Sequence, residues 1–303
     1  MVDTLSVKFD ITFHHRVTAY ALQMGGWLPL AFCSAPMLLV DRNVTGMLTA
    51  IDRGEVRGDI EANEWWLEFL NSQSFFVNPL LCAIEGKTRS SPSYEEFCSA
   101  FVEARAVLQK SLPKARIIDY EEKHYRAAYE IVKGFTLRYE AEVRFLACVA
   151  PMIAERHRDN VLPRVEQKIC ELAVSSGLPL RSFPLITALS CLYEPRDGTE
   201  PRIGRGVIKP SRIYSEEQAH NAIADLRALE TLVAVNSLGG PSAAFCTRDK
   251  YLAALWCGMQ ITDLGWRGGV MTFSTTPIQQ LFPRLNLGQH NALLKRLWSN
   301  DDV

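Results

Sequence analysis

Two aspartates of the chain each follow a short apolar run, close to the point where the run ends. Asp41 comes directly after residues 37–40 (MLLV), and Asp249 comes two residues after 243–247 (AAFCT). Short apolar runs with polar flanks are typical of buried strands. In a parallel α/β sheet, residues just beyond the carboxyl ends of the strands line the crevice where ligands bind. We therefore expect both carboxylates to point into one cleft if their strands are neighbours.

Two further acidic side chains are candidates for the same cleft. Glu85 follows a third apolar segment, residues 75–84, much as the aspartates follow theirs. Asp225 lies inside a predicted helix that begins after Ser215, on a stripe that flanks the apolar face. A half-buried acid in a helix needs a charged partner or a cation. Asn221, one turn earlier on the same side, is suited to position a water or to act as a second ligand.

These four acids have the chemistry of a ligand set for a hard divalent cation. The group contains no histidine or cysteine, and oxygen ligands are those that Mg²⁺ and Mn²⁺ prefer. Clustered carboxylates also raise one another's pKa values unless a metal ion is bound. A metal ion in such a site activates water and holds a scissile phosphate, so the pattern favours hydrolysis of phosphodiester bonds.

The motifs around two of the acids resemble those of PIN-domain nucleases. The run LLVDRN, with Asp41 and Asn43, is similar to the D-x-N at the first strand of that family. The run FCTRD, with Thr247 and Asp249, is similar to the family's late strand followed by T-x-D. Asn43 is expected to hold Asp41 by a side-chain hydrogen bond, and Thr247 is expected to hold Asp249 in the same way.

The order of the acids along the chain adds to this resemblance. Asp225 precedes the late strand, where the family places its third acid, and Glu85 lies between the first and third acids, as the family's glutamate does. The likeness covers residues 37–90 and 214–258, about a third of the chain. The chain departs from the family pattern at Glu85, which precedes Gly86 instead of beginning a helix.

The resemblance implies an α/β fold with a three-layer PIN-like core around a central, mostly parallel sheet. We expect residues 1–118 to form the N-terminal part of this core and residues 214–303 its C-terminal part. Residues 119–213 are expected to be a large all-helical insertion that includes a basic loop. Helical patterns fill 121–192, whereas glycines and prolines gather in 195–212.

The activity implied by the resemblance is that of a metal-dependent endoribonuclease, acting as a toxin or an antiviral effector. Asp41, Asp225 and Asp249 are then expected to hold one or two Mg²⁺ or Mn²⁺ ions. Glu85 is expected to be an additional ligand or a base that orients water. RNA is the expected partner, and DNA is the second choice.

Two other functions remain open at this point. The first is a non-catalytic interaction protein with a degenerate PIN-like fold, in which the predicted helices 61–70 and 121–191 form the surface for a homo-oligomer or a regulatory protein. The second is a HAD-type phosphatase, which also begins from a strand-end aspartate. That family requires D-x-D, whereas this chain has Asn43 at the second acid.

Charge is balanced over the chain and concentrated in one predicted loop. The 303 residues carry a formal net charge of −1, which excludes a protein that coats nucleic acid by bulk electrostatics. Residues 195–212 hold five basic and two acidic residues. We expect phosphate contacts from this loop and from Arg248, while an ordinary solvated loop is the alternative. The loop residues expected to make these contacts are Arg202, Arg205 and Lys209.

Some site residues also have a purely structural interpretation. Asp41 stands shortly before a predicted helix over 44–51, and Asp249 stands immediately before one over 250–258, where an aspartate side chain caps the first amides. In that case Asn43 would have only a role in the turn, and Thr247 would only cap the helix that follows Asp249. Asn43 or Thr45 could cap the first helix equally well. Glu85 has the alternative of an ordinary surface acid.

Two further alternatives concern residues within helices. Asp225 has the alternative of an ion pair with Arg227 or Arg248, either of which would neutralise its charge. The adjacent Trp65 and Trp66 lie in one amphipathic helix. Both are expected to pack in the core, which we favour over a platform that stacks on nucleic-acid bases.

We expect a cytoplasmic protein without a membrane span. No run of about 18 apolar residues occurs. The N-terminal sequence MVDTLSVKFD lacks the basic and apolar regions of a secretory signal. The eight cysteines form no C-x-x-C pair and lie mostly among apolar neighbours, so buried reduced thiols are expected.

Overall fold

The protein contains a six-stranded mixed β-sheet, seen in a computed structural model that describes residues 17–55, 60–72, 74–85, 90–196, 201–267 and 270–298. The strands are β1 Tyr20–Gln23, β2 Gly26–Pro29, β3 Met37–Val40, β4 Phe76–Asn78, β5 Arg116–Ile117 and β6 Ala243–Thr247. Their order across the sheet is β2-β1-β6-β3-β4-β5. The pairings β6–β3, β3–β4 and β4–β5 are parallel, whereas β1 is antiparallel to both of its neighbours, β2 and β6.

The predicted strands 37–40 and 243–247 are confirmed, and they are neighbours in the sheet. β3 pairs with β6 in parallel, with Val40 opposite Cys246. Neighbouring strands lie about 4.8 Å apart, so the residues that follow these two strands leave the sheet at the same edge. Asp41 directly follows Val40, and Asp249 lies three residues beyond Cys246.

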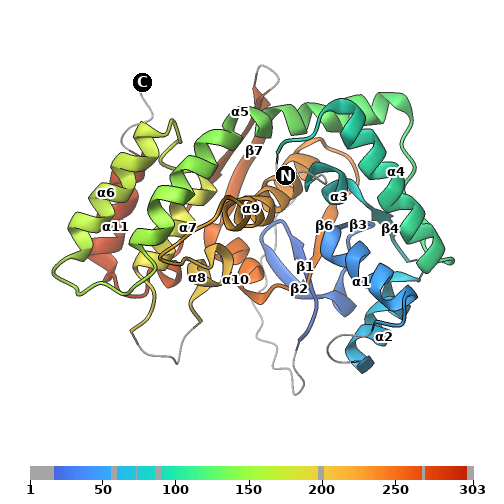
Figure 1. Ribbon diagram of the computed structural model, residues 1–303, viewed down its shortest axis with the longest axis horizontal. Helices are drawn as coiled ribbons and strands as arrows, with labels where there is room; N and C mark the ends of the chain where they lie inside the picture. Colours follow the sequence, from blue (N-terminus) through green and yellow to red (C-terminus); the bar gives the residue numbers. More distant parts are fainter. Residues whose placement is uncertain are drawn as a thin grey trace, which may run out of the picture.

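Helices cover both faces of the sheet, because successive strand residues point to opposite sides. Leu38 and Val40 belong to one hydrophobic cluster with residues of α1 and α2. Leu39 and Phe245 belong to a larger cluster with residues of α3, α4, α9 and α10. Figure 1 shows the sheet strands β3, β4 and β6 among these helices. The helices are α1 Arg42–Asp52, α2 Ile60–Leu70, α3 Leu80–Glu85, α4 Tyr94–Ser111, α9 Glu216–Ser237 and α10 Lys250–Met259.

The helices expected across residues 121–192 are present and share the larger hydrophobic cluster with the sheet. The helices at 162–175 and 183–192 lie on the side of the molecule away from α1 and α2, and the helix at 122–152 runs from beside α4 toward them (Figure 1). These helices are α5 Glu122–Met152, α6 Leu162–Ser175 and α7 Phe183–Leu192. Later in the chain are α8 Ile203–Ile208, α11 Leu287–Trp298 and a separate antiparallel ribbon of β7 Ile261–Arg267 and β8 Val270–Thr275. Two short 3₁₀ helices span Leu30–Phe32 and Gln279–Leu281.

The loop expected over 195–212 is partly wrong, because it contains helix α8. Gly204 is buried in this helix, and a Cβ atom there would lie 2.5 Å from the carbonyl oxygen of Thr187 and 2.7 Å from the amide nitrogen of Cys191. The glycine therefore permits α8 to contact α7 closely. Residues 197–200 of the expected loop lie outside the described residues.

No helix in the described part of the chain is both long and apolar enough to cross a membrane. A span needs about 20 consecutive apolar residues. The longest described helix, α5, has charged side chains along its length, such as Arg138 and Glu142.

Candidate active site

Two adjoining cavities lie at the carboxyl ends of β3 and β6, and all four predicted acids line them. The larger cavity has a volume of about 1110 Å³ and is lined by Asp41, Asp225 and Asp249. The smaller one, of about 250 Å³, is lined by Asp41, Asp225 and Glu85. Asp41 and Asp225 belong to both cavities. The structure therefore brings together acids that are separated by up to 208 positions in the sequence.

Asp41 lies at the N-cap of α1 and faces the cavities at the same time. Its Oδ1 accepts a hydrogen bond from the Val44 amide at 3.2 Å, and its Oδ2 accepts one from the Asn43 side-chain amide at 3.2 Å. Burial raises the pKa of Asp41, while these donors act in the opposite direction. Asn43 thus holds Asp41 by a side-chain hydrogen bond, as expected. The same carboxylate also caps α1, so the structural role considered as an alternative is present as well.

Asp249 has the same double placement at the N-cap of α10. Its Oδ1 accepts hydrogen bonds from the amides of Tyr251 at 2.7 Å and Leu252 at 3.1 Å. The Asp249 amide in turn donates to the Thr247 hydroxyl at 3.1 Å. Both capping bonds use Oδ1, so Oδ2 is the carboxylate oxygen left outside the cap. Thr247 was expected to hold Asp249 by a side-chain hydrogen bond; its hydroxyl instead accepts from the backbone amide of Asp249.

Asp225 comes to the cavities from the middle of α9, which the capping box of Ser215 and Gln218 begins as predicted. Burial, together with the nearby carboxylates of Asp249, Asp41 and Glu85, raises the pKa of Asp225 to about 7. Lys209 acts against this rise. Asp225 is therefore a poorly solvated acid that lies among other acids.

The alternative of an ion pair for Asp225 is not what the structure shows, because both candidate arginines have other partners. Arg227 forms an ion pair with Glu142 at 3.5 Å and donates to the Phe135 carbonyl at 2.9 Å. Arg248 donates to the Asn63 side-chain oxygen at 2.6 Å. The positive charge that lowers the pKa of Asp225 is instead that of Lys209.

Glu85 is the last residue of α3, at the smaller cavity. Its pKa is raised to about 7, mainly by burial and also by the charge of Asp41, against the opposing effect of the charge and backbone amide of Arg42. A surface acid would be well solvated, so Glu85 belongs with the site. Asn221 also lines the smaller cavity, one helical turn before Asp225, and is exposed to solvent.

The donor set fits a hard cation in its chemistry, although its ligands are not gathered closely enough to hold one as they stand. Within the described residues, no three histidine, cysteine, aspartate or glutamate side chains are placed to hold a metal ion together. The carboxylate oxygens are nevertheless the ligands that Mg²⁺ and Mn²⁺ prefer. Burial is the main cause of the raised pKa values of Asp225 and Glu85, and a cation among the acids would offset the repulsion that adds to it.

Of the basic residues predicted to contact phosphate, two line the cavities. Lys209 lines both, at the C-cap of α8, in a left-handed backbone conformation with φ 52° and ψ 53°. Arg248 lines the larger cavity, where its guanidinium lies over the Trp66 ring, 5.7 Å from the centroid. Arg202 lies at the N-cap of α8, outside the lining of both cavities.

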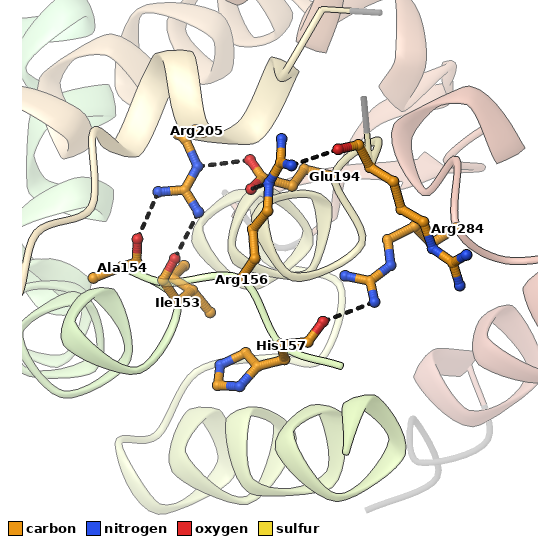
Figure 2. Close-up of polar contacts among 8 residues, drawn as sticks. Ile153, Ala154, Arg156, His157, Glu194, Arg205 and Arg284 are labelled. Carbon is orange, nitrogen blue, oxygen red and sulfur yellow. Dashed lines mark hydrogen bonds and ion pairs between the residues drawn. The ribbon is translucent and has the colours of Figure 1, made fainter. Parts of the chain in front are cut away.

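Arg205 has a structural environment instead of the expected phosphate contact. Its Nε donates to the buried carboxylate of Glu194 at 2.6 Å, and its two terminal nitrogens donate to the carbonyls of Ile153 and Ala154 at 2.9 and 3.0 Å. Figure 2 shows Arg156 approaching the same carboxylate, at 3.1 Å. The guanidinium of Arg205 therefore joins α8 to the end of α5.

Some lining residues were missed by the sequence reasoning. Lys250 and Tyr251 line the larger cavity directly after Asp249, and that position was the signal that could have found them. His220 lines the smaller cavity, and its Nδ1 lies 3.0 Å from the Tyr139 hydroxyl. Its position beside Asn221 on the same helix was the corresponding signal.

Comparisons with protein-family models, curated proteins and solved structures found no match for this chain. The interpretation of the site therefore depends on its geometry and chemistry.

Proposed function

We propose that this protein is a PIN-like, metal-dependent nuclease that hydrolyses phosphodiester bonds, with RNA as its first substrate class. The observation that carries the proposal is the environment of Asp225. This acid lines both cavities, the larger one with Asp41 and Asp249 and the smaller one with Asp41 and Glu85. The combined effect of burial and those acids raises its pKa to about 7. A fold does not keep such a costly arrangement for stability, and perturbed acids in a cleft are typical of functional sites.

The arrangement of the strands supports the proposal. The parallel strands β4, β3 and β6 are adjacent, and the acids Asp41 and Asp249 follow the two strands that pair directly. Ligands of open α/β sheets bind at this edge. The D-x-N and T-x-D motifs of the PIN family therefore fall in a structural context that suits their role.

In the proposed reaction, the acids and Lys209 have different roles. Asp41, Asp225 and Asp249 would hold Mg²⁺ or Mn²⁺, which when bound polarises the phosphate and lowers the pKa of water. Glu85, with its pKa raised to about 7, is suited to accept a proton from the attacking water near neutral pH. Lys209 would contact the phosphate that faces the acids.

The absence of a ready metal-ligand cluster within the described residues favours a second candidate function. A degenerate PIN-like protein that binds a partner without catalysis would also retain the fold and a loose acidic cleft. Only a measurement of cleavage separates the two candidates.

The decisive experiment measures Mn²⁺-dependent cleavage of single-stranded RNA by the wild type, Asp41→Asn and Asp249→Asn. Asparagine keeps the capping oxygen of each residue, so loss of the helix cap does not confuse the result. We expect each substitution to slow cleavage about 100-fold or more, because metal binding to the phosphate is worth several kcal/mol.

The matched control is Asp52→Asn, at the other end of α1, where the carboxylate pairs with Lys110 at 2.8 Å on the surface. It should cleave as the wild type does. Undiminished cleavage by both site variants would refute the site. If the wild type cleaves neither single-stranded nor duplex RNA or DNA, the binding protein is the better interpretation.

A further inference from the structure

One aromatic side chain, Trp65, lines the larger cavity without being part of the core. Its side chain is 42% exposed, whereas the adjacent Trp66 is 3% exposed. The expectation that both would be buried is therefore correct for Trp66 alone. Single exposed apolar residues are common on protein surfaces, so exposure alone does not indicate a function. Trp65 is notable because it lines the cavity that also holds Asp41, Asp225 and Asp249.

The Trp65 ring is supported from behind by other aromatic rings. It stacks on Phe69, with centroids 5.3 Å apart and an interplanar angle of 23°. Phe69 in turn packs against Phe75 at 5.2 Å. Since Phe69 covers one face of the indole, the exposed area belongs to the rest of the ring. An indole with few rotatable bonds and a packed back face loses little entropy when a ligand stacks on it.

Basic side chains line the same cavity beside the acids. Arg248 is held by its hydrogen bond to Asn63, at 2.6 Å, and by the Trp66 ring beneath it. Lys209 and Lys250 also line the cavity. Glu61, four residues before Trp65 in α2, lines it too. Aromatic rings with neighbouring cations are the usual components of single-strand binding grooves, where rings stack on bases and cations contact phosphates.

We propose that Trp65 stacks on an unpaired base of a single-stranded nucleic acid that lies across the larger cavity, with Arg248 on a neighbouring phosphate. This inference rests on the proposed function and specifies its substrate class as single-stranded. Bases within a duplex are already stacked on each other and cannot reach the indole, whereas bases of a single strand can.

The test is the binding of fluorescently labelled oligonucleotides, measured by anisotropy, to the full chain. Single-stranded RNA, single-stranded DNA and duplex RNA are compared with EDTA present and again with Ca²⁺. The variants are Trp65→Ala, Trp65→Leu and Trp65→Tyr. We expect the alanine and leucine variants to bind single strands about tenfold more weakly, and the tyrosine variant to bind nearly as the wild type does.

The matched control is Phe76→Ala. Phe76 is 41% exposed and has the Arg116 guanidinium over its ring at 5.3 Å, but it lies at the amino end of β4, away from the cavity. It should leave binding unchanged. Leucine at position 65 keeps an apolar contact with Phe69, so a merely structural role of Trp65 would be preserved in that variant. Melting temperatures of all variants check the fold.

The results separate this inference from the proposed function. Wild-type binding by Trp65→Leu would overturn the stacking inference, and so would equal affinity for duplex and single strand or no binding by the wild type. If cleavage depends on Asp249 while binding ignores Trp65, the nuclease stands and the stacking inference fails. If binding depends on Trp65 but no substrate is cleaved, the stacking inference stands and the nuclease fails.

Discussion

Replacing Asp225 with asparagine should make the metal-free protein more stable while it removes metal binding. The pKa of this carboxyl is 3.8 in ordinary surroundings and about 7 in the folded chain. The folded state therefore binds the proton more tightly than the unfolded state does. This favours folding at low pH, and the advantage is lost as pH rises from about 4 through about 7. Above that range the folded protein holds an ionised carboxylate among other acids.

The size of this effect follows from the change in acidity. A rise from 3.8 to about 7, at about 1.4 kcal/mol for each tenfold change, makes the ionised form about 4 kcal/mol less stable at pH 8. This is an upper limit, because neighbouring acids share the cost and asparagine leaves a polar group in place. We expect Asp225→Asn to unfold with about 2–4 kcal/mol more free energy at pH 8, and with at most half of that gain at pH 5.

The assay is urea-induced unfolding at pH 5 and pH 8, with and without Mg²⁺. Without metal, Asp225→Asn should be the more stable protein, and the difference should grow with pH. Mg²⁺ should stabilise the wild type, by about 2.7 kcal/mol at a concentration 100 times its dissociation constant. It should leave the variant nearly unchanged, because one of three carboxylate ligands has lost its charge.

The control for this experiment is Asp52→Asn, which changes the same atoms outside both cavities. Its stability should differ from the wild type by less than about 0.5 kcal/mol. A variant Asp225→Asn that is less stable than the wild type at pH 8 would refute the reasoning. Equal stabilisation of both proteins by Mg²⁺ would show that the cation, if it binds, binds elsewhere.

Two further predictions concern the packing of α8. Arg205→Ala removes a donor from the buried carboxylate of Glu194, so the free energy of unfolding should fall by about 3 kcal/mol; cleavage per folded molecule should stay unchanged, whereas a specific loss of substrate affinity would restore Arg205 to the phosphate-binding set. Gly204→Ala places a Cβ 2.5 Å from the Thr187 carbonyl oxygen, so it should cost about 1–3 kcal/mol in urea unfolding; a neutral effect would mean that α8 and α7 are less closely packed.

The edge of the sheet could be predicted from the sequence because its signals are local. The run 37–40 is apolar and ends at Asp41, and the run 243–247 is apolar and lies just before Asp249. The general rule that parallel strands gather their carboxyl ends then brings the acids together. The register that pairs Val40 with Cys246 was not visible in the sequence, but the prediction did not depend on it.

The surroundings of α8 could not be predicted, because they depend on partners that are distant in the sequence. Gly204 suggested a loop, since glycine permits flexible turns, yet here it permits close packing against α7. The sequence around Arg205 suggested a solvated cation. Only the fold shows that its guanidinium donates to Glu194 and to a carbonyl at the end of α5. Composition indicates charge and flexibility, but it does not indicate which of them is buried.

The difference between Trp65 and Trp66 shows a similar limit. Both lie in the amphipathic helix α2, and the helical period alone cannot decide which of two adjacent rings is covered. The structure covers Trp66 with the core and with Arg248, and leaves Trp65 at the cavity.

Helix capping does not remove the carboxylates of Asp41 and Asp249 from the cavities, because both residues cap a helix and line a cavity. Asp41 and Asp249 accept amide hydrogen bonds at the N-termini of α1 and α10, and such donors and the helix dipoles stabilise negative charge. Asp225 lies in the middle of α9, far from that helix's N-terminus, and receives its compensation from Lys209. A bound cation would therefore change the energy of Asp225 more than a cap can. This is why the substitution of Asp225 is the sharpest test of whether the cleft holds a metal ion.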